Sequence, residues 1–232
     1  MRPVADITVF STLAIKEAYL ALAPQFESAR GHRLVTSWMG MVDILKHIKA
    51  GEVADLVIAS AMTVDDLARA GKIPGERRDI ARSGVAVAVR AGAPKPDIGS
   101  AEAVKRALLR ARSIAYSSGP SGVYLSQLFE RWGVAQELKS RITQTPPGSA
   151  VGPLVARGEA EIGFQQMSEL LPIPGIDIVG PLPPEIQTIT VFSGGIPASA
   201  KHAEAAREFL EYLRSPAAVP VLKQKGMESA AR

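Results

Sequence analysis

The sequence predicts an α/β protein of two doubly wound lobes, and three observations support this fold class. Short β-rich runs alternate with amphipathic helical stretches from residue 7 to residue 71. The run at 54–59 is almost continuously apolar, as expected for a parallel strand covered by helices on both faces. A second series of strands and helices begins near residue 84. An open, doubly wound sheet in each lobe accounts for all three observations.

Each element of the first lobe is predicted from an apolar run and a signal at its end. Hydroxyl or acidic residues are typical of helix starts, and glycine is typical of helix ends. Ser11 or Thr12 is expected to cap the first helix, and Asp65 is expected in the first turn of the third. The predicted strands are 7–10, 33–37 and 54–59, and the predicted helices run from Leu13 to Gly31, Val42 to Gly51 and Thr63 to Gly71.

The middle of the chain repeats this organisation, and the last two helices are expected to pack back on the first lobe. Lobe 1 is assigned to 1–84 plus 190–232, and lobe 2 to 85–189. Two crossing strands, near Ser83–Val87 and Thr188–Val191, form the expected hinge beside a central cleft. The other predicted elements are strands at 84–89, 113–116, 162–164 and 189–192, helices at 103–109, 123–132, 202–213 and 216–226, and a Pro- and Gly-rich loop at 171–184.

The composition limits the function classes. The chain has 232 residues, no cysteine, 5% aromatic residues and a net charge of +4. Its basic side chains are scattered rather than gathered in a stripe, so no nucleic-acid partner is expected. No apolar run reaches about 18 residues, so no membrane insertion is expected. His32, His47 and His202 are far apart and no nucleotide-binding motif is present, so neither a metal nor a cofactor is predicted.

Polar and small residues follow most of the predicted strands. Hydroxyl, amide and helix N-terminal N–H donors attract anions without a formal positive charge. Because ligands of open α/β sheets bind outside the carboxyl ends of the strands, these residues predict a small anionic ligand. The alternative is that they are ordinary caps and turns. The candidate ligand-binding residues are Ser11, Thr12, Met39, Gly40, Met41, Ser60, Arg82, Ser117, Ser118, Gly119, Ser121, Gly122, Tyr124, Gln165 and Gln166.

Arg82 is the one cation in this set. A guanidinium beside the first crossing strand can bind a carboxylate through two parallel hydrogen bonds. Since Arg77 and Arg78 are close by in the sequence, the alternative is a surface arginine in a basic neighbourhood.

Four stretches resemble the bacterial solute-binding proteins of the molybdate-binding type. Three are Ile7–Thr12, Ile48–Ile58 with its Ala-Gly-Glu-Val-Ala-Asp-Leu run, and Gly158–Phe164, which reads Gly-Glu-Ala-Glu-Ile-Gly-Phe. The fourth is Phe209–Ala218, and the likeness extends over nearly the whole chain. The resemblance implies a type II periplasmic-binding-protein fold, hinge closure on an anion, and delivery of that anion to an ABC permease.

The binding positions depart from the pattern that the resemblance implies for molybdate. That pattern has a serine after the first strand and another at the start of the second helix. Met39-Gly40-Met41 offers no hydroxyl at the second position, and the family's ligand-binding tyrosine falls on Gln166. A small organic carboxylate is therefore expected rather than molybdate or tungstate.

Two alternatives to transport stay open at this point. Some proteins that resemble this family isomerise aconitate, which requires a base and anion-stabilising donors. Tyr124, Asp43 and His47 are the candidate bases. The other alternative is a cytoplasmic ligand sensor. The first residues show no signal peptide, so a periplasmic location is expected if a leader has been removed, and a cytoplasmic one otherwise.

Overall fold

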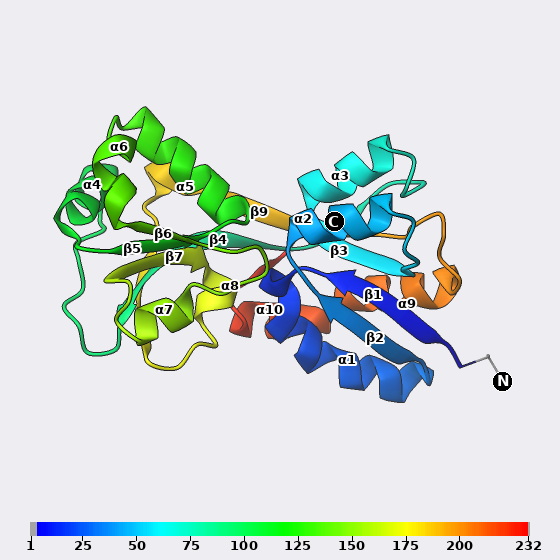
Figure 1. Ribbon diagram of the computed structural model, residues 1–232. Helices are drawn as coiled ribbons and strands as arrows, with labels where there is room; N and C mark the ends of the chain where they lie inside the picture. The colour runs from blue at the N-terminus through cyan, green and yellow to red at the C-terminus, as the bar shows by residue number, and fades with distance from the viewer. Residues whose placement is uncertain (1–3, 232) are drawn as a thin grey trace. The chain divides into compact units, whose positions relative to one another are not determined.

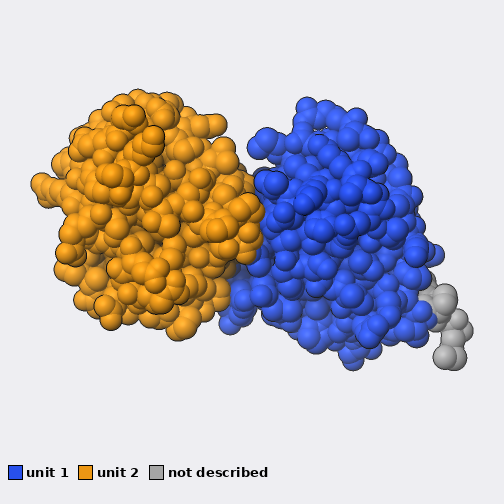
Figure 2. Space-filling model, viewed as in Figure 1, with its two compact units in different colours: residues 1–82, 191–232 blue, residues 83–190 orange. Residues whose placement is uncertain are grey.

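The computed structural model describes residues 4–231 and divides into two units that are coloured separately in Figure 2. Unit 1 consists of Met1–Arg82 and Val191–Arg232, and unit 2 of Ser83–Thr190. The chain leaves unit 1 within strand β4 (Arg78–Arg90) and returns within β9 (Ile189–Gly195). Unit 1 is therefore discontinuous in sequence.

Unit 1 contains a sheet in the strand order β2-β1-β3-β9. The first three strands are parallel, whereas β9 is antiparallel to β3 and β10 pairs with β4 at Ala81 and Arg82. The other elements of the unit are β1 (Asp6–Ser11), η1 (Leu13–Ile15), α1 (Lys16–Arg30), β2 (Arg33–Trp38), α2 (Met41–Lys49), β3 (Leu56–Ser60), α3 (Ala61–Arg69), α9 (Ala203–Leu213), α10 (Ala218–Gln224) and β10 (Glu228–Ser229).

Alternating side chains along the strands of unit 1 build a core on each face of the sheet. Ile7 and Val9 of β1 belong to the core formed with α1, α9 and α10, in which Phe26 and Phe209 are fully buried. Phe10 of the same strand belongs to the core beneath α2 and α3. Figure 1 shows these two groups of helices on opposite sides of the strands. Because both faces are covered, the strands read as continuous apolar runs.

Unit 2 contains the strand order β4-β7-β5-β6, with β8 also paired to β4. β5 is parallel to β6 and β7, whereas β4 is antiparallel to β7 and β8. The other elements of the unit are α4 (Ala101–Arg110), β5 (Ile114–Ser117), α5 (Pro120–Arg131), α6 (Ala135–Leu138), η2 (Lys139–Arg141), β6 (Ile142–Thr145), α7 (Gly152–Ala156), β7 (Ile162–Gln166), α8 (Met167–Leu170), β8 (Ile176–Pro181) and η3 (Pro184–Ile186).

The sheet of unit 2 is also covered on both faces. Val85 and Val87 of β4 pack in the core that includes α4, α5 and α6. Ala86 and Ala88 point the other way and pack with Leu170 of α8. Figure 1 shows α7 and α8 on the side of the strands opposite α5 and α6. The predicted α/β class and its doubly wound layering are confirmed.

Several local expectations are wrong. The third helix begins at Ala61 rather than near Thr63, so Asp65 lies beyond its first turn. Neither Ser11 nor Thr12 caps a helix through its side chain, and the hydroxyl of Ser11 instead donates to the carbonyl oxygen of Thr12. Capping at that point is therefore left to backbone groups.

The strand content also differs from the sequence prediction. The expected loop at 171–184 contains β8, whose backbone pairs with β4 despite the surrounding proline and glycine residues. β6 was not predicted, because two of its four residues are exposed and polar. β2 alternates exposed and partly buried residues because it is the edge strand, so it does not share the apolar character of β3. None of the helices in the part of the chain that the structure describes has the length and apolar character needed to cross a membrane.

Asp55 ties three segments of unit 1 together. Its side chain is buried, and Oδ1 accepts hydrogen bonds from the backbone N–H groups of Lys201 and His202, at 2.7 Å each. Oδ2 accepts the N–H of Thr8 at 2.9 Å. The carboxylate therefore satisfies backbone donors just before α9 while fixing the start of β3 beside β1.

Replacing Asp55 with Asn should destabilise the protein by about 2–3 kcal/mol, because one of the two acceptor oxygens becomes an N–H₂ group that faces a buried N–H. Chemical unfolding measures this change. Asp66→Asn is the matched control, since Asp66 makes only an exposed pair with Arg69, and it should cost less than about 1 kcal/mol. Equal losses in the two variants would contradict the assigned role of Asp55.

Candidate functional site

The carboxyl end of β1 gathers the first group of predicted ligand-binding residues. β1 lies between β2 and β3, and all three strands are parallel, so their carboxyl ends share one edge of unit 1. Backbone bonds hold this edge together beyond the strands: Met39 N–H donates to Ser11 O, and Thr12 N–H donates to Ile58 O, both at 3.0 Å. Helices α2 and α3 begin here, and their first N–H groups point out of the helix ends.

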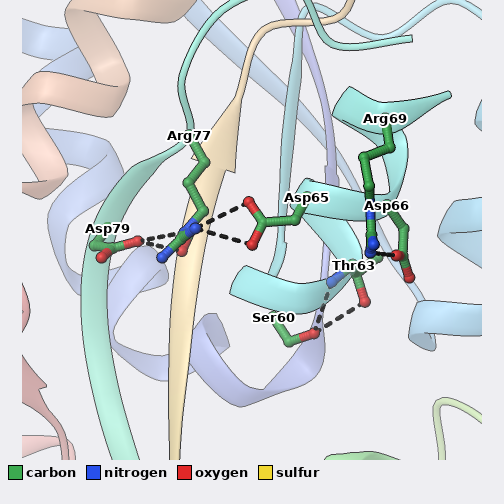
Figure 3. A network of polar contacts seen from close by, with 8 residues as sticks. Ser60, Thr63, Asp65, Asp66, Arg69, Arg77 and Asp79 are labelled. Carbon is green, nitrogen blue, oxygen red and sulfur yellow. Dashed lines mark hydrogen bonds and ion pairs between the residues drawn. The ribbon is translucent and has the colours of Figure 1, made fainter. Parts of the chain in front are cut away.

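Ser60 organises the start of α3. Its Oγ accepts the N–H of Thr63 at 3.2 Å and lies 2.9 Å from the Thr63 hydroxyl, as Figure 3 shows. The Thr63 hydroxyl also lies 3.6 Å from the sulfur of Met41 at the start of α2. Two helix N-termini are thus joined by hydroxyl and thioether contacts. We call Ser11, Thr12, Ser60 and Thr63 the unit 1 cluster.

The turn at 39–41 supplies no hydroxyl to this edge. Gly40 precedes the first turn of α2 and makes no side-chain cap, and Met39 and Met41 are both partly exposed. Two flexible, polarisable thioether side chains therefore flank a helix N-terminus whose backbone N–H groups are its polar donors.

The carboxyl end of β5 gathers the second group. β5 is parallel to both neighbours, and Ser117 is in register with Thr145 at the end of β6. Ser117 Oγ lies 3.1 Å from Ser121 Oγ in the first turn of α5, and both side chains are buried. We call Ser117, Ser121, Thr145, Gln165 and Gln166 the unit 2 cluster.

Two glycines let α5 start directly above β5. Gly119 precedes the helix in an extended conformation, and Pro120 occupies its first position, where its missing N–H costs nothing. Gly122 lies so close to β5 that an added Cβ would meet the Ser117 carbonyl oxygen at 1.5 Å. This close approach brings the first turn of α5 onto the end of the strand.

Gln165 and Gln166 end β7 with both side chains buried. Gln165 accepts the N–H of Val151 at 2.8 Å and donates to Glu169 at 2.9 Å, so both ends of its amide are engaged. Gln166 donates to the hydroxyl of Thr190 at 2.8 Å, but its Oε1 is a buried atom without a hydrogen-bond partner.

The bond to Thr190 gives the Gln166 amide a choice of orientation. A hydroxyl can donate as well as accept, so the amide can turn by 180° and keep the bond. In the turned orientation, an N–H₂ group faces the position that has no partner. An unsatisfied buried amide is costly, and an anionic ligand would satisfy it.

Three other predicted residues have different surroundings. Ser118 is partly exposed beside Gly119. The Tyr124 hydroxyl donates to the Ile186 carbonyl at 2.7 Å, so its proton is engaged in fixing η3. Arg82 is half-exposed and forms an ion pair with Glu228 at 2.8 Å, across the pairing of β4 and β10. Because that pair already neutralises its charge, Arg82 is left out of both clusters.

A charged hollow of about 410 Å³ lies elsewhere in unit 1. Its wall includes Arg77, whose guanidinium bonds to Asp65 and Asp79 at 2.9 Å each, as drawn in Figure 3. Asp79 also accepts the hydroxyl of Ser193 at 2.7 Å. These contacts tie α3 to β4 and β9, so Arg77 has a structural role rather than that of a solvated surface charge. Among the described residues, no three potential metal ligands gather closely enough to hold an ion.

Three residues at these strand ends were not predicted from the sequence as candidate site residues. Thr63 is three residues after Ser60, the spacing of an N-cap and its N3 partner, so this pair could have been recognised. Thr145 ends a strand that was not predicted. Glu169 had no sequence signal, because its position depends on the fold around Gln165.

Two α/β units joined through β4 and β9 are the architecture of the type II periplasmic-binding-protein fold. The family model for bacterial extracellular solute-binding proteins matches residues 7–228, and the chain belongs to that family. The family resemblance recognised in the sequence is confirmed.

Two curated relatives extend the comparison. Over 98% of its length, the chain is 39% identical to aconitate isomerase of Pseudomonas sp, covering 89% of that protein. It is 24% identical to the molybdate-binding protein ModA of Escherichia coli (strain K12), over 95% of this chain and 88% of the relative. Among solved structures, the periplasmic molybdate-binding protein of Azotobacter vinelandii superposes with a TM-score of 0.79 at 23% identity, covering 96% of this chain and 98% of that one.

The packing of α5 on β5 can be tested with two glycines of the same turn. Gly122→Ala should destabilise the protein by about 1–3 kcal/mol or more, because the new methyl group overlaps the Ser117 carbonyl. Gly119→Ala should cost less than about 1 kcal/mol, since its Cβ would meet only Ser117 Oγ at 3.6 Å. Denaturant unfolding compares them, and a Gly122→Ala variant as stable as Gly119→Ala would contradict the close approach.

Proposed function

We propose that the protein binds a small organic polycarboxylate of the aconitate class through donors at the carboxyl ends of its strands. The observation that carries this proposal is the turn at 39–41, where Met39 and Met41 stand in place of the hydroxyl that a tetrahedral oxyanion would use. Methyl and thioether groups match the carbon skeleton of an organic acid, and the adjoining N–H and hydroxyl donors match its carboxylates.

The unit 2 cluster supports the same ligand class. Ser117, Ser121 and the first N–H groups of α5 are donors at a helix N-terminus, which favours negative charge. Gln166 adds an amide that can turn its N–H₂ group toward a carboxylate. Among organic acids we favour aconitate, because the chain is 39% identical to an aconitate isomerase.

In this role the protein is a solute-binding component that closes on its ligand and passes it to an ABC permease. The family of extracellular solute-binding proteins supports that assignment. Closure of two lobes around a ligand is a known hinge motion of such folds. A leader directing export would precede the residues that carry this function.

A second candidate function is isomerisation of aconitate. The specific observation that favours it is the 39% identity to an aconitate isomerase over nearly the whole chain. The reaction requires donors for a developing carbanion, and the clusters provide hydroxyl, amide and helix N-terminal groups of this kind. It also requires a base.

Ligand binding can be measured by a thermal-unfolding screen of cis-aconitate, trans-aconitate, citrate, molybdate and sulfate. The aconitates should stabilise the protein by about 2.7 kcal/mol when present at a hundredfold excess over the dissociation constant. Molybdate should give little stabilisation, because the second hydroxyl position is methionine. Molybdate as the tightest ligand would contradict the proposal.

The same ligand screen on the Gln166→Leu variant tests whether the Gln166 amide binds the ligand. Leucine fills a similar volume without polar atoms, so aconitate affinity should fall about tenfold to a hundredfold, as expected for a lost bond to a charged group. Gln25→Leu is the matched control, because Gln25 is exposed on α1. Equal affinities for both variants would exclude Gln166 from the site.

Isomerisation can be detected by proton NMR of trans-aconitate incubated with the protein in deuterated water. The second candidate function predicts appearance of cis-aconitate together with exchange of solvent deuterium into the methylene position. An unchanged spectrum at high protein concentration, under conditions where the thermal screen shows binding, would leave binding as the function and contradict catalysis.

A further inference from the structure

Glu169 lies at the edge of unit 2 where the strand-end donors gather. It belongs to α8, which follows β7 without an intervening residue. β7 is parallel to β5, so Glu169 comes just after the strand end that lies beside Ser117. The residue is partly buried, with some of its surface exposed.

A hydrogen-bonded relay fixes the Glu169 carboxyl group. The backbone N–H of Val151 donates to Gln165 Oε1 at 2.8 Å, and Gln165 Nε2 donates to Glu169 Oε1 at 2.9 Å. Since Val151 offers only a donor, the Gln165 amide must direct its N–H₂ group at Glu169. The partner of the carboxyl group is therefore an uncharged donor in a defined orientation.

This setting suits a carboxyl group that exchanges protons. Burial raises the pKa of Glu169 to about 7, and the Gln165 hydrogen bond acts in the opposite direction. On the same short helix, Met167 and Leu170 pack with Ala86 and Ala88 of β4. Both protonation states are thus populated near neutral pH, which is the condition for efficient general acid–base catalysis.

The bases considered from the sequence are less well placed. The Tyr124 hydroxyl donates its proton to the Ile186 carbonyl oxygen, so that proton already holds η3 in place. His47 bonds to Glu52 at 2.6 Å and belongs to the last turn of α2, the end away from the strand-end donors. Asp43 lies in the first turn of α2 in unit 1, outside unit 2 and its cluster of donors.

We propose that Glu169 is the catalytic base that removes and returns the substrate proton in the isomerisation of aconitate, with Gln165 as its positioning residue. This inference rests on the second candidate function above. It assigns a role to the hydrogen-bonded Gln165–Glu169 pair, which ligand binding alone does not require.

The step balances within the substrate. The Glu169 carboxylate takes a proton from the methylene carbon next to a carboxylate, so a C–H bond breaks and an O–H bond forms. The electron pair spreads through the adjacent double bond into the conjugated carboxylates, where donors of the unit 2 cluster stabilise it. Return of the proton to the former vinyl carbon moves the double bond by one position and regenerates the Glu169 carboxylate.

The test compares wild-type protein with Glu169→Gln, Glu169→Asp and the control Glu161→Gln. Glu161 precedes β7 at its opposite end and bonds to Arg112, so its replacement should leave turnover unchanged. Glu169→Gln should lower kcat at least a hundredfold while aconitate affinity, measured by thermal shift, changes less than threefold. Glu169→Asp should retain part of the activity, because a base remains.

The pH profile separates catalysis from a structural role. Wild-type kcat/KM should rise with pH through an apparent pKa near 7, and the Glu169→Gln variant should lack this rise.

If wild-type protein binds aconitate but does not convert it, the isomerase function and this inference both fail. If wild-type protein converts aconitate and Glu169→Gln keeps its kcat and pH profile, only the inference fails. Should Glu169→Gln not fold, a wild-type profile without a limb near pH 7 overturns it instead.

Discussion

The parallel alignment of strands at the edge of each sheet is the constraint on which the rest of the structure depends. Parallel strands place all their carboxyl ends on one side, and the following helices must therefore begin there. Each helix start leaves backbone N–H groups without intrahelical partners. In unit 1 this arrangement joins the ends of β1 and β3 to α2 and α3, and in unit 2 it joins β5 to α5.

This arrangement makes anion binding a property of the fold and leaves anion selectivity to a few side chains. Methionines flank the start of α2, and a glutamine whose amide oxygen has no partner ends β7. Neither feature changes the number of backbone donors, but both change what shape of ligand those donors can satisfy. In the proposed functions, the same donors serve transport or proton transfer, because donors that hold a carboxylate also stabilise an enolate-like anion. On that proposal, the difference between the two functions depends on one positioned carboxyl group.

Most of the fold could be predicted from the sequence because the buried strands have a strong apolar signal, as at 54–59. Prediction failed where tertiary context decides: β6 carries polar residues at exposed positions, and β8 forms only because β4 extends far enough to pair with it. Among site residues, Ser60, Ser117 and Gly122 follow recognisable strand ends. The pairing of Arg82 with Glu228, 146 residues away, and the relay from Val151 to Glu169 join distant segments that no local pattern connects.

A crystal structure of the protein grown with trans-aconitate would test the central claim most directly. Trans-aconitate is expected with its carboxylate oxygens within hydrogen-bond distance of Ser60 or Thr63 at the start of α3 and with its carbon chain against Met39 or Met41. A ligand bound away from these strand ends, for example at the charged hollow beside Arg77, would contradict the proposed function.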